Sequence, residues 1–269
     1  MPAQSKMCAF CGKEGPHPEA HIWPRSLNRV EKGTALKVYK INGEVPPKTS
    51  QTGVYDSDLW CLSCEEASSA LENQVTPFLL EIDKHKKHVL KSAGNPLLGT
   101  GPIEVSTIEK VDPAAMQRFV LSVLWRCSAS NRPEVAKFTL GPYQERIREA
   151  LQSKDNELLR PFDYFIRLES EPRLRGSFFT PANTKFSGVR YTRFSGGGFT
   201  FDVKMSSRPA PSDIRTGHSG TDGPVLLIGH TLLETADGRK MVPKLRAQMG
   251  ASDFSQFLAA HRSKRLTGA

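Results

Sequence analysis

Apolar side chains recur at helical spacing in three segments that follow residue 75. After Thr76-Pro77, residues 78–92 carry their apolar side chains broadly on one side, which is typical of an amphipathic helix. Asp112-Pro113 and Gly141-Pro142 each precede another such segment, and a proline at the first helical position is a common start signal. Helices are therefore expected across about 77–153, with a last one at about 252–264.

The pattern changes after Pro161. Four short segments are rich in β-branched and aromatic residues and alternate in places between apolar and polar: FDYFIRLES, GVRYTRFS, GFTFDVKMS and PVLLIGHTLL. The glycines Gly196-Gly197-Gly198 separate two of these segments, as in a hairpin loop. The pattern predicts an antiparallel sheet over about 162–235, and together with the helices it gives an α+β fold.

The first 75 residues differ from the rest. They show little apolar periodicity, and residues 32–51 are polar and rich in glycine and proline. A segment of this size and polarity cannot bury a large core of its own, so we expect a bound metal to organise it. The expected division is a metal-binding module at residues 1–75 followed by a basic α+β domain at residues 76–269.

Basic residues are distributed unevenly along the 269 residues, whose net charge is +9. Residues 1–73 hold 8 basic and 9 acidic side chains, whereas the rest of the chain holds 29 and 19. A basic excess suits phosphate binding, so nucleic acid is the expected partner. Residues that could line a nucleic-acid groove are Trp125, Arg126, Arg190, Arg193 and Lys204. We interpret them as ordinary surface, because strand alternation alone turns polar residues outward.

No apolar run approaches the roughly 18 residues that a membrane-spanning helix needs. The N-terminal sequence MPAQSKMCAF also lacks the apolar core of a signal peptide. We therefore expect a cytoplasmic protein with no membrane partner.

Four of the five cysteines form two Cys-x-x-Cys pairs, Cys8 with Cys11 and Cys61 with Cys64. Gly12 follows the first pair, as a tight metal-binding turn requires, and the second pair leads directly into helical sequence. In a reducing compartment two such pairs indicate metal rather than disulfides. We therefore predict one structural Zn²⁺ bound by four thiolates. Cys127 lies among apolar residues of a predicted helix and is interpreted as a core residue.

Between the cysteine pairs stands Glu19-Ala20-His21-Ile22-Trp23-Pro24, and with the flanking cysteines this order resembles the HNH (ββα-metal) endonuclease family. The resemblance covers residues 5–75. It implies a treble-clef-like module in which His21 is the general base for phosphodiester hydrolysis, a role that suits a group with a pKa near ~6.5. Ala20 stands where the family usually has an acidic residue before the histidine.

The same resemblance assigns two carboxylates. Asp56 falls near the family's central asparagine and would orient His21, and Glu65 follows the last cysteine, where the family has a metal-binding histidine or asparagine. Oxygen ligands of this kind suit a catalytic Mg²⁺ or Mn²⁺. Local explanations remain open: His21 could bond within the zinc module, Asp56 could be a turn residue, and Glu65 could be a helix N-terminal acid. Glu72, on the same predicted helix, is interpreted as part of a solvated face.

Two functions are compatible with these patterns. The first is a metal-dependent HNH-like endonuclease, with DNA as the expected substrate. The second is a catalytically inactive zinc module that docks nucleic acid or a protein partner, which Ala20 and Glu65 favour. The later part of the chain contains no G-x-S-x-G sequence and no phosphate-binding loop that would indicate an unrelated active site. Homo-oligomer formation is left open.

Overall fold

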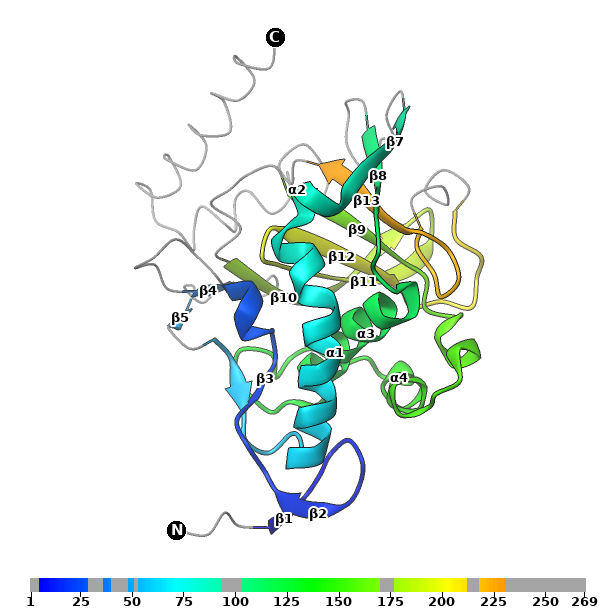
Figure 1. The fold of residues 1–269 in the computed structure, drawn as a ribbon. Coiled ribbons are helices and arrows are strands. Elements are labelled where there is room, and N and C mark those ends of the chain that lie inside the picture. The colour runs from blue at the N-terminus through cyan, green and yellow to red at the C-terminus, as the bar shows by residue number, and fades with distance from the viewer. Residues whose placement is uncertain are drawn as a thin grey trace.

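The structure, a computed structural model, describes residues 5–28, 36–39, 48–50, 53–92, 103–169, 177–211 and 218–230. In these residues a mixed sheet of nine strands is covered on one side by helices, and two short ribbons lie below it (Figure 1). The helices are α1 (Leu62–Leu80), α2 (Ile82–His85), α3 (Pro113–Ala129) and α4 (Tyr143–Gln152), with 3₁₀ turns η1 (Arg25–Asn28) and η2 (Asn156–Leu159). The helix expected at 252–264 lies outside the described residues.

The large sheet is assembled from distant parts of the chain. In spatial order its strands are β5 (Lys48–Ser50), β4 (Leu36–Tyr39), β10 (Ser177–Phe186), β11 (Val189–Gly196), β12 (Phe199–Lys204), β9 (Tyr164–Glu169), β13 (Val225–His230), β8 (Ile103–Ile108) and β7 (Lys86–Ser92). Neighbouring strands are antiparallel except in the pairs β4–β10 and β9–β13. The α+β class and the largely antiparallel sheet are therefore confirmed.

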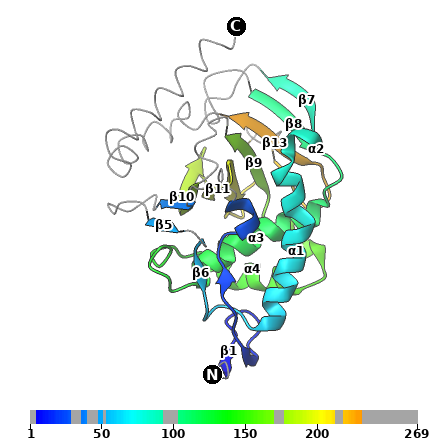
Figure 2. The same ribbon diagram turned by 60° about the vertical axis from the view of Figure 1, so that its left-hand side comes forward.

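Two ribbons complete the described strands. β1 (Ser5–Met7) pairs with β2 (Glu14–Pro16), and β3 (Ala20–His21) pairs with β6 (Tyr55–Asp56), both antiparallel. The β3–β6 ribbon is followed along the chain by α1, which lies beside α3 (Figure 2).

Helix α3 is the centre of the core. Its N-cap is Asp112, whose carboxylate accepts a hydrogen bond of 2.9 Å from the N–H of Ala114, and Pro113 occupies the first turn. Its side chains are buried around most of its circumference, because α1, α4 and the sheet all pack near it. The starts predicted at Asp112-Pro113 and Gly141-Pro142 are confirmed, as is the buried position of Cys127.

The helix expected over residues 78–92 is wrong in both its start and its end. Pro77 lies inside α1, which continues to Leu80 because Val75, Thr76 and Leu79 are buried there. After the short α2, residues 86–92 form β7, which pairs with β8 as the last two strands of the sheet. Long-range strand pairing thus overrides a local helical pattern, and both strands fall within the range expected to be helical.

Trp23 joins the cysteine-containing part of the chain to the sheet. Its indole is fully buried and stacks on Phe178, with ring centroids 5.4 Å apart, and it also contacts Phe194 and Phe201. One hydrophobic cluster contains Cys8 and Trp60 as well as the sheet phenylalanines. The boundary expected at residue 75 falls inside α1, and the two predicted parts share this core.

We expect Gly196→Ala to destabilise the protein, because the absent side chain makes room for Trp23. A Cβ added at Gly196 would lie 2.6 Å from Cζ2 of Trp23, whose ring has no exposed surface into which to move. Overpacking of this kind costs about 1–3 kcal/mol of unfolding free energy. Urea denaturation measures the loss, and Gly223→Ala is the control because a Cβ there meets no atom. Equal stability of the two variants would contradict the packing described for Trp23.

Candidate metal centre

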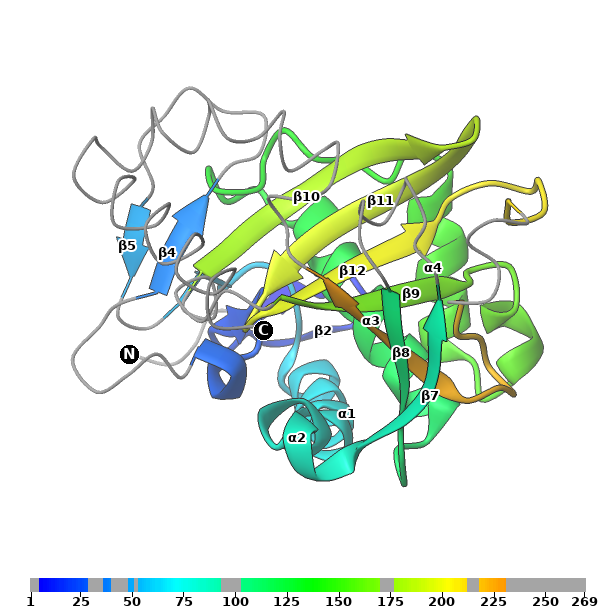
Figure 3. The same cartoon turned by 90° about the horizontal axis from the view of Figure 1, so that it is seen from above.

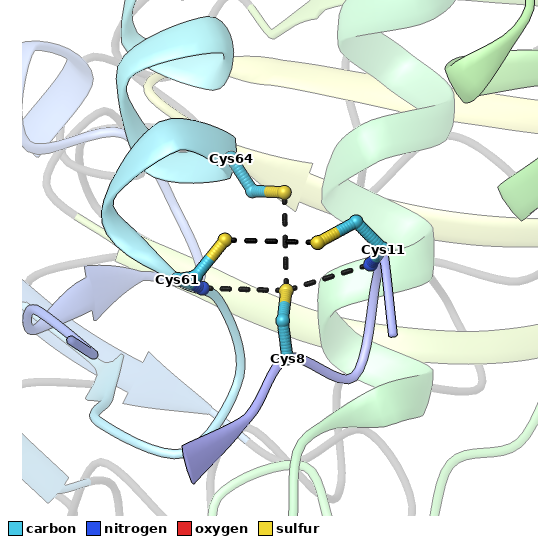
Figure 4. A group of neighbouring side chains, drawn as sticks. All are labelled: Cys8, Cys11, Cys61 and Cys64. Carbon is cyan, nitrogen blue, oxygen red and sulfur yellow. Dashed lines mark hydrogen bonds between the residues drawn. The ribbon is translucent and has the colours of Figure 1, made fainter. Parts of the chain in front are cut away.

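The sulfur atoms of the four cysteines in the two Cys-x-x-Cys sequences lie close together around a common centre, as Figure 4 shows. Their Sγ atoms all lie within 4.8 Å of one another, with 3.8 Å between Cys8 and Cys64 and 3.7 Å between Cys11 and Cys61. Metal–sulfur bonds of about 2.3 Å in a tetrahedral site separate the sulfur atoms by about 3.8 Å. A disulfide would bring two of them to about 2.05 Å, and all four are free. The cluster therefore has the dimensions of a tetrahedral thiolate site and could bind zinc.

Backbone geometry brings the two pairs together. The first pair forms a tight turn in which the N–H of Gly12 donates to the carbonyl of Cys8 over 2.9 Å, and Gly12 has a φ of +70° that favours glycine. Cys61 caps the N-terminus of α1, and its N–H points at the Cys8 sulfur over 3.3 Å. The N–H of Cys11 approaches the same sulfur at 3.5 Å. Both N–H groups would stabilise negative charge on the Cys8 thiolate.

The thiols differ in how easily they ionise. A hydrogen bond with the Ser63 hydroxyl, 3.3 Å long, lowers the pKa of Cys61 to about 6. Burial raises the pKa of Cys64 and of Cys11 above the ordinary thiol value. Four clustered sulfurs therefore do not all ionise by themselves, and a divalent cation that binds here displaces the remaining protons.

Aromatic packing attaches the first cysteine turn to the helices. The ring of Phe10 lies 5.8 Å from that of Trp60 and 5.0 Å from that of Trp125, and the two indoles stack. From α4, Arg148 donates a 2.9 Å hydrogen bond to the Phe10 carbonyl, and Gln152 donates another. The first cysteine turn is therefore in direct contact with α3 and α4.

The structure separates the side chains of His21 and Asp56. In the β3–β6 ribbon Ala20 is opposite Asp56, and His21 is opposite Tyr55. Because opposite residues share a face and successive residues alternate, the His21 and Asp56 side chains lie on opposite faces of the ribbon. The geometry does not support Asp56 as the residue that orients His21.

The Asp56 carboxylate is engaged in structural contacts. One oxygen accepts a 2.5 Å hydrogen bond from the Ser130 hydroxyl at the end of α3. The other accepts a 2.8 Å bond from the N–H of Asp58, which closes a local turn. With 6% of its surface exposed, Asp56 holds the ribbon against α3.

Arg126 is the residue that sequence reasoning missed, since it was interpreted as surface. It is 1% exposed, and its Nη1 donates to the backbone carbonyl of His21 over 2.6 Å and to the Glu72 carboxylate over 2.7 Å. Its guanidinium also lies 5.2 Å from the Trp60 ring centre. A charged residue within the apolar α3 sequence was the available signal. Glu72, expected on a solvated face, is instead half-buried in this ion pair.

Glu65 lies near the charges of Arg126 and Glu72. Burial raises the pKa of Glu65, the neighbouring Glu72 raises it further, and the positive charge of Arg126 opposes both effects. Among the described residues, only the four cysteines form a group of histidine, cysteine or acidic side chains close enough to hold a metal ion. His21, Asp56 and Glu65 therefore form no such group in this structure.

The other residues that could line a nucleic-acid groove differ in how far they are exposed. Trp125, Arg193 and Lys204 are buried, so the interpretation of these three as surface is wrong, whereas Arg190 is exposed. Arg193 and Arg167 both donate hydrogen bonds to the buried carboxylate of Asp202. The helices of the described segments include none with the length and apolar character needed to cross a lipid bilayer.

Comparisons with known proteins provide no relative from which a role could be transferred. No family model, curated protein or solved structure matches this chain. The function of the chain is therefore inferred from the geometry of the cysteine cluster, the ribbon and the charged side chains.

Proposed function

We propose that the chain is a zinc-organised nucleic-acid-binding protein in which β3, β6 and α1 form a ββα module of the HNH type without a catalytic metal. The supporting features of the module are the two-stranded ribbon that precedes a helix, and the four cysteines at the base of that helix. Four thiolates at tetrahedral spacing suit Zn²⁺, which has no redox chemistry and serves here as a structural ion. Residues Cys8, Cys11, Cys61 and Cys64 would hold it.

The position of Arg126 is the observation that carries this proposal. Its Nη1 atom donates both to the backbone carbonyl of His21 in the ribbon and to the Glu72 carboxylate on α1. The Arg126 charge is already paired with Glu72 over 2.7 Å, so this carboxylate has its cation without a bound metal.

The charge of the chain supports nucleic acid as the partner. The net charge is +9, and the basic excess lies after residue 73. Lysine and arginine side chains that neutralise phosphates release counterions, which favours association. DNA is the partner that we propose.

A second candidate function is the HNH-like endonuclease, favoured by the surroundings of the His21 ring. His21 is half-buried on the first strand of the ribbon, 6.3 Å from the ring of Tyr55, and the guanidinium of Arg132 lies 5.6 Å from that same tyrosine ring. His21 and Arg132 both lie near Tyr55, and in this function His21 would be the general base and Arg132, which also pairs with Glu134, an anion contact. In this function Glu65 and a bound Mg²⁺ or Mn²⁺ would complete the site.

The two candidates predict different results with plasmid and linear DNA in the presence of Mg²⁺ or Mn²⁺. We expect zinc-loaded wild type and zinc-loaded His21→Ala both to bind DNA in a salt-dependent way and neither to cleave it. Gel mobility and product analysis report the two activities, and zinc content is measured for each preparation because an unfolded module would mimic a catalytic defect. Cleavage by wild type that disappears in His21→Ala would replace the first proposal with the second.

A further inference from the structure

The turn between β10 and β11 lies at one end of these two strands, as Figure 3 shows, and exposed cations surround it. Lys185 and Arg190 are directly opposite each other on the two strands, and both side chains are exposed. The turn itself consists of Ser187 and Gly188, whose φ angles of 46° and 79° give a two-residue hairpin. Two positive charges thus flank a narrow turn.

Arg208 adds a third charge from a different segment. β12 runs antiparallel to β11, so its end lies beside the start of β11. There the N–H of Met205 donates a 2.9 Å hydrogen bond to the carbonyl of Arg190. The Nη1 atom of Arg208 comes within 4.0 Å of the position that a Cβ on Gly188 would occupy, so its guanidinium lies over the turn. Lys204 holds this segment in place, because its Nζ donates to the carbonyls of Ser206 and Arg208.

The hairpin is fixed by packing beneath its tip. Phe186 and Val189, the pair that flanks the turn, are buried in a cluster with Phe165 and Tyr191. The ring of Phe186 lies 5.0 Å from that of Tyr191 and 5.5 Å from that of Phe165. A tip held in one conformation loses little entropy when it binds a partner.

None of the three cations forms an ion pair, as far as the described segments show, whereas several other exposed bases do. Lys84 pairs with Glu81, Lys86 with Asp83, and Arg160 with Glu157 and Asp222. The charge of Lys185, Arg190 and Arg208 is therefore not neutralised within the described chain, and it is concentrated on one projecting turn.

We propose that this basic hairpin, defined by Lys185, Arg190 and Arg208, contacts the phosphates of duplex DNA. The inference rests on the proposed nucleic-acid function and assigns its contact surface. Because β12 lies beside β11 as far as Met205, opposite Arg190, the hairpin presents its cations to DNA from the end of a sheet, and cations placed in this way contact the phosphate backbone.

The test measures by fluorescence anisotropy how a labelled 20-base-pair DNA duplex binds at different salt concentrations. Wild type is compared with a triple variant, Lys185→Gln, Arg190→Gln, Arg208→Gln. Each phosphate contact contributes about 0.9 to the slope of log affinity against log salt, so the slope should fall by about 2.7. Arg208→Gln alone should lower it by about 0.9. That single variant removes a side chain with no hydrogen bond to the described residues, so its fold should be intact.

A matched control shows whether an effect comes from the position of the removed charges or from the lower net charge of the protein. The variant Lys84→Gln, Lys86→Gln, Arg160→Gln removes the same number of exposed charges, each from an ion pair, and should leave the slope within about 1 of wild type. An equal loss in this control, or an unchanged slope in the hairpin variant, would overturn the hairpin assignment while leaving nucleic-acid binding intact. Failure of wild type to bind any nucleic acid would refute both proposals.

Discussion

We expect Cys8→Ser to purify without stoichiometric metal and to unfold at a much lower temperature than wild type. The Cys8 sulfur is central to the cluster, since two backbone N–H groups point at it and Cys64 lies 3.8 Å away. Structural zinc contributes about 10–16 kcal/mol to the folding of small zinc domains. Whole domains have net stabilities of about 5–15 kcal/mol, so loss of the ion is comparable to the entire stability.

The effect should extend beyond the cysteine turns. Phe10 packs between Trp60 and Trp125, so release of the first turn exposes aromatic surface on α3. Elemental analysis gives the metal content, and circular dichroism follows thermal unfolding. Cys127→Ala is the control, because Cys127 is fully buried in the core and outside the cluster. This variant should keep one metal per chain, and its stability should fall only by the small amount that a cavity of one sulfur atom costs. A Cys8→Ser protein with wild-type metal content and melting temperature would contradict a structural metal site.

The second large effect is expected for Arg126→Met, which removes a buried charge but keeps most of the length of the side chain. Glu72 would then be left as a half-buried carboxylate without its cation, and the His21 carbonyl would lose its donor. Breaking a buried ion pair from one side costs about 3–5 kcal/mol. Chemical denaturation measures the change in unfolding free energy.

A second substitution distinguishes lost pairing from lost packing. In Arg126→Met, Glu72→Gln the unpaired negative charge is removed as well, so part of the stability should return. Glu72→Gln alone should also be destabilised, because Arg126 would then be buried without its acid. A cost for Arg126→Met below about 1 kcal/mol, or no recovery in the double variant, would show that the ion pair between Arg126 on α3 and Glu72 on α1 does not stabilise the fold.

Features set by local chemistry could be predicted from the sequence. The Cys-x-x-Cys spacing predicts the metal-binding cluster, because a tetrahedral site needs two short turns and little else. Asp112-Pro113 predicts the start of α3, since capping involves neighbouring residues. The three glycines at 196–198 predict the β11–β12 hairpin, in which Gly197 and Gly198 have positive φ.

Features set by distant contacts could not be predicted in this way. Residues 86–92 have an amphipathic helical pattern, yet they pair with β8 as a strand. β4 pairs in parallel with β10, far along the chain, and no local signal specifies that contact. The opposite faces of His21 and Asp56 follow from the register of a two-residue ribbon, which spacing along the sequence does not determine.

The proposed function requires one structural metal at the cysteines and no catalytic metal between the ribbon and α1. Both requirements are tested together by elemental analysis of zinc-loaded protein after dialysis against Mn²⁺ and removal of free ions. We expect one zinc per chain and no manganese, because Arg126 already provides the positive charge beside Glu72. One manganese per chain that is absent from His21→Ala would contradict this proposal and would place a catalytic metal at the ribbon.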